Sequence, residues 1–355
     1  YRTKTIGKGL AGMKIAVLFG GKSTEHDISC LSASFILKNL TKHQVFKIGI
    51  TQQGDWFYTA ATPEQIANGE WINNPDNIAV GVDLNQKAFT YDGQTFVPDV
   101  VFPVLHGKNG EDGTIQGLLE IMRVPYVGCR VLGSAVCMDK AITKVLLKEA
   151  AIEQVPWIMV EKAECTDGVD SILSRIEQSL SYPVFVKPAN AGSSIGITRC
   201  DDAQQVPEAL KIAFEVDRRV VIEQGLEDIL EVEIAVLGND DVVTSTTGLI
   251  QPSNEFYDFE AKYVSEDSKL QIPSGVPEEP VIKKLAEKAY RACDCKGLAR
   301  VDFMIDRKTR TVYLNEINTM PGFTAISMYP KLFENSGLES EQLVEKLISL
   351  ALDFS

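Results

Sequence analysis

The chain has 355 residues, of which 45% are hydrophobic and 24% charged, and its formal net charge is -14. This length and composition predict two or three domains of an ordinary globular protein, and the acidity argues against a general nucleic-acid binder. No stretch reaches the roughly 18 apolar residues of a membrane span, so we expect no membrane partner.

Residues 1–12 lack the apolar segment of a secretory signal peptide and precede Met13, which we take as the natural start. We therefore expect them to be an addition to the natural chain. Seven cysteines without a secretory context predict reduced thiols and a cytoplasmic protein. Cys293 and Cys295 are too close for a CxxC motif, and packing roles are expected for both.

The first part of the chain alternates predicted strands and helices. Its apolar runs and segments of helical spacing come in the order 14–19, 29–40, 45–50, 99–105 and 114–122. This order predicts a parallel α/β sheet over residues 13–134, in which ligands bind beyond the carboxyl ends of strands. Glu25 and His106 directly follow strand ends, although a structural role explains a lone histidine equally well.

The middle part, residues 135–224, predicts a small α+β domain. Its helices and strands are expected at 139–151, 155–160, 168–180, 182–187, 203–215 and 219–223. Lys187 ends one of these strands and precedes a glycine-rich run, whose N–H groups can approach phosphate oxygens. The GxxxxGK[ST] order is absent, and an ordinary glycine turn is equally compatible. Lys140 opens a predicted helix, where surface charge is the simpler interpretation.

Glu223 and Leu226 lie between the last two predicted domains, where an adenine could bind against the backbone or where the chain is simply a linker. The last part, residues 225–355, is expected to hold strands at 231–237 and 243–250 and helices at 278–293 and 340–352. A polar loop over 252–276 suits a lid that excludes water, or a loop packed on its own aromatics. The glycine-rich segment at 20–25 lacks GxGxxG, so a dinucleotide site is not expected, and the segment at 107–114 suits a flexible turn better than a second phosphate loop.

A predicted hairpin near the end of the chain carries the most specific pattern. Alternation of side chains along its strands places four polar residues on one face: Arg300, Asp302, Glu316 and Asn318. Pairing residues 307 and 311 across the turn sets Asp302 opposite Glu316 and Arg300 opposite Asn318. Carboxylate and amide oxygens suit Mg2+, which usually arrives with phosphate. A solvated polar hairpin is the alternative.

Taken together, these segments resemble D-alanine–D-alanine ligases of the ATP-grasp superfamily. The matching motifs keep their order from Met13 to Leu352 and lie at residues 20–29, 105–114, 138–140, 187–196, 256–263, 300–302 and 315–322. The resemblance implies an ATP-grasp fold with domains at 13–134, 135–224 and 225–355, the first a parallel-sheet domain, and ATP between the other two. It also implies a homodimer.

The resemblance implies a reaction as well. ATP would phosphorylate the carboxylate of a first D-alanine, and the amine of a second would attack the acyl phosphate to give D-alanyl-D-alanine for peptidoglycan synthesis. The negative transition states need cations and hydrogen-bond donors.

By the same resemblance, two Mg2+ ions, for which Mn2+ can substitute, would be held by Asp302, Glu316 and Asn318. The residues implied to bind ATP are Lys140, Lys187, Ser194, Glu223, Leu226, Glu231 and Lys262. The residues implied to take part in catalysis are Glu25, His106, Ser193, Tyr263, Arg300 and Gly322. The residues implied to bind the amino acids are Glu25, His106, Ser327 and Met328.

Several of these implied roles are specific. Glu25, in a set with Ser193 and Tyr263, would bind the first ammonium, while Arg300 and the Gly322 N–H would stabilise the oxyanion. Lys262 would reach the transferred phosphoryl group. His106 would sit by the first carboxylate, Ser327 would bind the second carboxylate, and Met328 would contact the second methyl group.

The chain departs from the family pattern near the nucleotide. Gln224 follows Glu223 where a charged or larger residue is expected, and the spacing from Glu223 allows Glu233 to replace Glu231.

Related ligases join D-alanine to D-serine or D-lactate. Tyr263 and Met328 favour D-alanine, because lactate-joining relatives carry a histidine near the first position and resistance-type relatives an arginine at the second. An ATP-grasp ligase of L-amino acids and a nucleotide-binding sensor are the other hypotheses, and the intact hairpin argues against the sensor.

Overall fold

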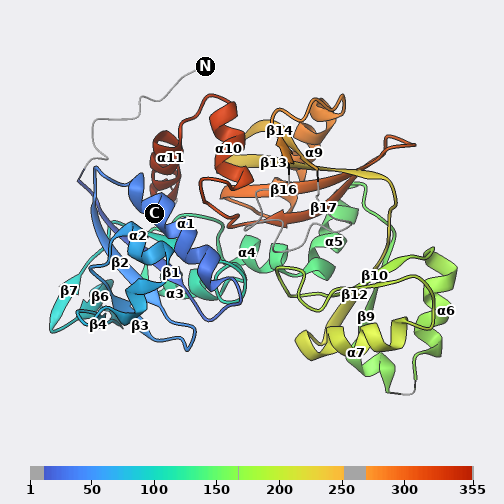
Figure 1. The fold of residues 1–355 in the computed structure, drawn as a ribbon, viewed down its shortest axis with the longest axis horizontal. Helices are drawn as coiled ribbons and strands as arrows, with labels where there is room; N and C mark the ends of the chain where they lie inside the picture. Colours follow the sequence, from blue (N-terminus) through green and yellow to red (C-terminus); the bar gives the residue numbers. More distant parts are fainter. Residues whose placement is uncertain (1–11, 167, 252–268, 354–355) are drawn as a thin grey trace.

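The computed structural model describes residues 12–166, 168–251 and 269–353, which form three main sheets with helices packed around them (Figure 1). The predicted lid segment falls largely outside these residues. None of the helices in the described ranges is long and apolar enough to cross a membrane.

The N-terminal sheet has the strand order β4-β3-β2-β1-β8. Its parallel core is β1 (Lys14–Gly20), β2 (Gln44–Ile50) and β8 (Val100–Val104), as the apolar runs predict. Helix α1 (His26–Lys38) begins three residues earlier than expected, directly after Glu25. Because β1 and β8 are neighbours, the loops that carry Glu25 and His106 leave the same edge of the sheet.

Residues 51–98 contain elements that the sequence pattern did not indicate. The short strands β3 (Trp56–Tyr58) and β4 (Ile78–Ala79) extend the main sheet in antiparallel fashion. A separate three-stranded sheet and two single-turn helices complete the region: α2 (Pro63–Ala67), η1 (Glu70–Asn73), β5 (Gly81–Asp83), β6 (Ala88–Tyr91) and β7 (Gln94–Phe96). These strands have two to four residues each, too few to establish a periodicity.

The central sheet, β11-β10-β12-β9, is antiparallel. Its strands are β9 (Trp157–Glu161), β10 (Val184–Pro188), β11 (Thr198–Cys200) and β12 (Arg219–Gln224), with η2 (Lys162–Cys165), α6 (Asp170–Ser179) and α7 (Val206–Val216) between them. Val184, Val186 and Ile222 pack with α6 and α7 in one buried cluster. Alternation therefore turns Lys187 and Glu223 to the opposite face, toward α5 (Lys140–Glu149).

The C-terminal sheet has the order β15-β14-β13-β16-β17. Its strands are β13 (Ile229–Gly238), β14 (Val243–Gln251), β15 (Lys269–Gln271), β16 (Gly297–Asp306) and β17 (Val312–Asn318). The predicted loop 252–276 was wrong at its end, since β15 lies within it. Helix α9 (Glu279–Ala292) covers the apolar face of the sheet with Ile282 and Ala286.

The hairpin of β16 and β17 contains a β-bulge. Asp302 pairs with Glu316 and Arg300 with Asn318, as predicted, but Phe303 pairs with Leu314, which leaves Asn315 as an extra residue. The predicted turn pairing was wrong by one residue, because the Asp306 N–H donates to Thr311 O at 3.0 Å. The bulge restores the register and returns Glu316 and Asn318 to the face of Arg300.

The final two helices contact each other and also pack against elements that are distant in sequence. Helix α10 (Met328–Asn335), which was not predicted, and α11 (Ser340–Leu352), which was, share a buried cluster with strands β1 and β8. Figure 1 shows α11 beside the N-terminal elements. Two further helices, α3 (Thr114–Met122) and α4 (Val131–Met138), lead from the first sheet to α5.

Candidate active site

Arg300 lies in the middle of a buried charged cluster on the polar face of the β16–β17 hairpin. Its Nε and Nη2 each donate to an Asp302 carboxylate oxygen at 2.8 Å, and Asn318 Nδ2 donates to Asp302 Oδ2 at 3.0 Å. Arg300 is 6% exposed and Asp302 7%. A buried bidentate pair of this kind holds both groups in one geometry.

Glu233 completes this cluster, and the sequence interpretation assigned it only as a substitute for Glu231. It lies opposite Asp302 across β13 and β16, and its Oε2 is 3.0 Å from Arg300 Nε. Glu231, two residues earlier on the same face, lies opposite Met304 and is half-buried. The sequence did contain a pattern that indicates Glu233, because acidic and apolar residues alternate from 231 to 234 and place Glu231 and Glu233 on the same face of β13.

The oxygen donors of the hairpin fit a metal that is shared with phosphate. Within the described ranges, no group of three or more His, Cys, Asp or Glu side chains forms a metal site by itself. Asp302, Glu316 and Asn318 supply two carboxylates and an amide. Mg2+ is bound in this way, through one or two carboxylates with water and substrate phosphates as its other ligands. The donor set therefore fits Mg2+ that arrives with a nucleotide.

On the central sheet, Glu223 is held between two lysines. Lys187 Nζ lies 2.6 Å from Glu223 Oε2, and Lys144 Nζ lies 3.0 Å from Oε1. Burial favours the neutral acid, but the charges of Lys144 and Lys187 hold the pKa of Glu223 at about 2. Burial lowers the pKa of Lys144. This lysine was not singled out from the sequence. Its position four residues after Lys140 places both lysines on one helix face.

Lys140 and Asp139 fix the glycine-rich loop to the start of α5. Lys140 Nζ donates to Ala191 O at 2.5 Å, and the Lys140 N–H donates to Ala189 O at 2.8 Å. Asp139 caps the helix by accepting from the N–H groups of Ala141 and Ile142, and it also pairs with Arg219. The loop that was predicted to bind phosphate is thus anchored at the positive end of a helix.

In the glycine-rich loop, Ser193 and Ser194 both adopt left-handed backbone angles, with φ of 49° and 58°. The Ser193 Oγ is buried and has no hydrogen-bond partner in the described part of the chain. Such an atom is costly unless a ligand or another group satisfies it. This serine therefore fits the binding role that the family resemblance implies.

Glu25 faces this loop from the N-terminal sheet. A Cβ on Gly107 would stand 2.2 Å from Glu25 Oε2, and one on Gly192 would stand 3.0 Å from it, so the Glu25 carboxylate approaches both glycines closely. Glu25 is 7% exposed. The structure thus brings together Glu25 and the loop of Ser193, which lie more than 160 residues apart in sequence.

His106 is buried at the end of β8, and both ring nitrogens are engaged. Nε2 lies 2.9 Å from Ser32 Oγ, and Nδ1 lies 2.8 Å from Met320 O. Burial lowers the pKa of His106 to about 4, although the bond to Met320 opposes the shift. The imidazole is therefore neutral near pH 7 and contacts the segment that carries Gly322.

Glu111, in the same loop, is a carboxyl that the sequence interpretation did not single out. It accepts from the Gly107 N–H at 2.9 Å and from the Met320 N–H at 3.0 Å. Burial, and then the negative charge of Glu25, raise the pKa of Glu111 to about 8.

Ser327 and Met328 stand at the start of α10. Ser327 Oγ accepts from the Thr324 N–H at 3.0 Å, in a compact turn that precedes the helix. Met328 is 5% exposed, and a Cβ on Gly248 would meet its sulfur at 2.7 Å. Its packing in the core leaves little of the side chain for a substrate, and the methyl contact stays a prediction.

For the other predicted site residues that the structure describes, it gives burial but no contact that bears on their predicted roles. Leu226 is half-buried after β12, and Gly322 is buried between Pro321 and Phe323. Lys262 and Tyr263 lie outside the described residues.

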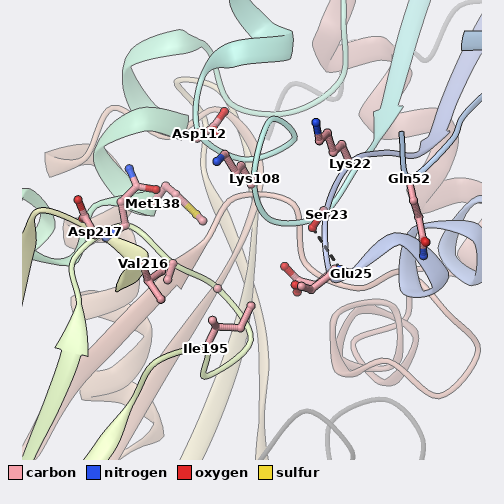
Figure 2. Close-up of a pocket in the computed structure, with 14 residues that line it drawn as sticks. Lys22, Ser23, Glu25, Gln52, Lys108, Asp112, Met138, Ile195, Val216 and Asp217 are labelled. Carbon is pink, nitrogen blue, oxygen red and sulfur yellow. Dashed lines mark hydrogen bonds between the residues drawn. The ribbon is translucent and has the colours of Figure 1, made fainter. Parts of the chain in front are cut away.

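A cavity of about 750 Å3 separates the N-terminal loops from the glycine-rich loop (Figure 2). Lys22, Ser23, Glu25 and Lys108 line one side, and Ile195, Val216 and Asp217 line the other. Its size suits small molecules and its rim carries charges of both signs.

Comparisons with known proteins identify the family of the chain. The family described as D-ala D-ala ligase N-terminus matches residues 14–129, and the one described as D-ala D-ala ligase C-terminus matches residues 146–349. The chain belongs to the D-alanine–D-alanine ligase family. Membership confirms the predicted ATP-grasp fold and the prediction of an ATP-dependent ligase.

Individual members of the D-alanine–D-alanine ligase family align over nearly the whole chain. The D-alanine–D-alanine ligase of Acetivibrio thermocellus is 48% identical, with 96% of each chain covered. That of Thermoanaerobacter sp. strain X514 is 49% identical, again with 96% of each covered.

Two solved structures of ligases are also similar. The VanG D-Ala:D-Ser ligase from Enterococcus faecalis has a TM-score of 0.87 at 37% identity, covering 96% of this chain and 99% of that one. The D-alanine-D-alanine ligase from Coxiella burnetii has a TM-score of 0.85 at 34% identity, covering 97% and 95%.

Proposed function

We propose that the chain joins two D-alanine molecules through an acyl phosphate, with ATP as the phosphoryl donor. The observation that carries the proposal is the hairpin face, where Arg300, Asp302 and Asn318 are hydrogen-bonded together. This face offers oxygen ligands for a metal–phosphate complex and, beside them, a cation for developing negative charge.

The nucleotide is proposed to lie between the central sheet and this hairpin. Lys140, Lys187 and Ser194 would contact phosphates, with Lys262 at the transferred group. Glu223 and Leu226 would bind adenine, and Glu231 the ribose. Lys144 supports this arrangement, because it pairs with the same carboxylate as Lys187 and holds Glu223 ionised.

Two Mg2+ ions are proposed to be held by Asp302, Glu316 and Asn318. When bound, they would neutralise phosphate charge and favour transfer. The guanidinium of Arg300 lies beside this donor set and, together with the Gly322 N–H, would stabilise the oxyanion of the tetrahedral intermediate.

For the amino acids, Glu25 would bind the first ammonium, with Ser193 and Tyr263 in the same set. The close approach of Glu25 to Gly107 and Gly192 supports this role. Ser327 would bind the second carboxylate and Met328 would contact the second methyl group. His106 is proposed to act near the first carboxylate through the segment it contacts.

We further propose that the chain has domains at 13–134, 135–224 and 225–355, works in the cytoplasm and forms a homodimer. The three main sheets support the division.

The reaction is tested by a coupled assay of phosphate release with ATP and D-alanine as the only amino acid. Turnover that depends on D-alanine and produces the dipeptide is expected. Turnover that requires an L-amino acid instead would contradict the proposal.

D-Serine is a second candidate for the second substrate, because a D-Ala:D-Ser ligase shares the fold at a TM-score of 0.87. Comparing D-alanine, D-serine and D-lactate as second substrates in the same assay separates the alternatives. A kcat/KM for D-serine above that for D-alanine would favour the alternative.

A further inference from the structure

The segment of residues 319–323 is held from outside its own sheet. It follows β17, carries Gly322, and is buried along its whole length. Three hydrogen bonds join its backbone to side chains of helix α1 and of the loop that follows β8. Glu111 accepts from the Met320 N–H, and Ser32 accepts from the Phe323 N–H. His106 bonds to Met320 O.

The directions of these bonds follow from the chemistry of the groups. A carbonyl oxygen only accepts, so His106 Nδ1 carries the proton that is donated to Met320 O. In the neutral ring, Nε2 is then an acceptor for the Ser32 hydroxyl, at 2.9 Å. The Ser32 oxygen in turn accepts from the Phe323 N–H at 3.0 Å. Each hydrogen bond in this chain thus has one donor and one acceptor, and the Ser32 hydroxyl donates in one bond and accepts in the other.

Glu111 binds the other backbone polar group of the same residue, the Met320 N–H. One of its oxygens accepts from Met320 and the other from Gly107, so the carboxyl ties the segment to the loop that follows His106. The two polar groups of Met320 are therefore both held by residues 106–111, and neither depends on β17 for its partner.

We infer that Ser32, His106 and Glu111 are positioning residues that hold residues 319–323 and thereby orient the Gly322 N–H. We call this set the bracket. The inference rests on the proposed function, in which that N–H stabilises the oxyanion. None of the three needs to touch the substrate, because they act on the backbone beside the donor. Oxyanion donors must be preorganised, and a displacement of about 1 Å is enough to reduce turnover about a hundredfold.

The bracket is tested with Ser32→Ala and Glu111→Gln in the full chain. Ser34→Ala is the control for the first, since Ser34 is buried in the same helix two residues later. Glu120→Gln is the control for the second, since Glu120 lies on α3 and pairs with Tyr126 instead. The readouts are amide hydrogen exchange in residues 319–324, kcat and KM for ATP and D-alanine, and binding of ADP.

A further readout separates positioning from general damage. A phosphinate dipeptide, whose tetrahedral phosphorus resembles the intermediate, is used as an inhibitor. Loss of an interaction made in the transition state weakens such an analogue in parallel with kcat.

We expect faster exchange at Phe323 in Ser32→Ala and at Met320 in Glu111→Gln. We also expect kcat to fall about 10- to 100-fold with a parallel loss of phosphinate affinity, while ADP binding is unchanged. The double variant should lose less than the product of the single losses, because the residues act as a unit. The two controls should resemble the unaltered chain.

Unchanged exchange at both amides would overturn the inference, and so would a kcat close to that of the unaltered chain in both variants. Equal losses in the controls would also overturn it. If Ser32→Ala does not fold, Glu111→Gln carries the same test. If the unaltered chain fails to use D-alanine, the proposed function fails, whereas the exchange measurement still tests the bracket.

Discussion

Glu223 illustrates how one buried residue depends on its neighbours. Its carboxylate stays ionised only because Lys144 and Lys187 offset the cost of burial. The sequence located Glu223 and Lys187 by their motifs, but Lys144 belongs to no motif that we recognised, and only the contact reveals it.

We predict that Lys144→Met destabilises the chain, because it leaves Glu223 with one partner. Breaking a buried pair costs about 3–5 kcal/mol, and the remaining lysine should keep the loss at or below that range. Urea unfolding at pH 7 measures it. Lys148→Met, at an exposed position on the same helix, is the control and should change little. Equal stabilities of the two variants would contradict the role of the pair.

A second prediction concerns the hairpin carboxylate Glu316. Glu316→Gln removes a charged metal ligand and should reduce turnover at least about a hundredfold, if Mg2+ stabilises the transition state. Steady-state phosphate release at saturating Mg2+ is the measurement. Asp240→Asn, whose side chain is 96% exposed, serves as the control. Turnover unaffected by Glu316→Gln would remove the metal assignment.

At the scale of elements, the bulge at Asn315 decides which face of β17 carries the polar residues. Val312 and Leu314 point into the apolar core before the bulge, and Ile317 does so after it. If β17 kept all its residues but alternated regularly from Leu314, with no bulge, Glu316 would point toward that core instead.

Deletion of Asn315 should keep the fold and most of the phosphate release, because the flanking residues then alternate regularly and Glu316 and Asn318 stay on the polar face. Asn315→Ala keeps the residue count and should retain most of the activity. Thermal unfolding and the phosphate assay are both recorded. Loss of folding or of phosphate release in the deletion variant, but not in Asn315→Ala, would contradict this account of the bulge.

The loop that carries Glu111 predicts a pH dependence of stability. The pKa of Glu111 is raised from 4.5 to about 8, first by burial and then by Glu25, while Gly107, Met320 and Arg300 oppose the shift. A raised carboxyl pKa means that the folded state binds the proton more tightly. The contribution of this group to stability is therefore fully present below about 4.5 and is lost as the pH rises through 8.

The stability of the unaltered chain relative to Glu111→Gln should consequently fall as the pH rises from about 5 to 8. Urea unfolding at several pH values measures the difference. A pH-independent difference for Glu111→Gln would contradict the raised pKa.

At the scale of the whole molecule, the ends of the chain share one core. Leu347 and Ile348 of α11 belong to the same buried cluster as Val17 and Phe19 of β1. The N-terminal sheet and the last helix are therefore expected to unfold together, even though the family boundaries divide the chain between them.

Leu347→Ala should cost about 2–5 kcal/mol and lower the unfolding temperature in a single transition. Calorimetry measures both effects. Gln342→Ala, exposed on the same helix, is the control. Separate transitions for the N-terminal part and the remainder would contradict the shared core.

Periodicity predicted the longer elements well, because apolar spacing is a local property. α11 and the strands β1 and β2 lie close to their predicted positions, whereas β3 to β7 were missed because they are short. α10 was missed as well, since its eight residues include Pro330 and do not establish a repeat.

The sequence by itself determined the family motifs, their order, and the polar face of the hairpin, because alternation along a strand and residue chemistry are both local. Only the tertiary structure decided that Glu111 lies near Glu25 and that Ser32 and His106 hold residues 320 and 323. Those contacts join segments up to about 290 residues apart. Their geometry is set by how the cores pack, and that packing leaves no pattern in the neighbouring residues.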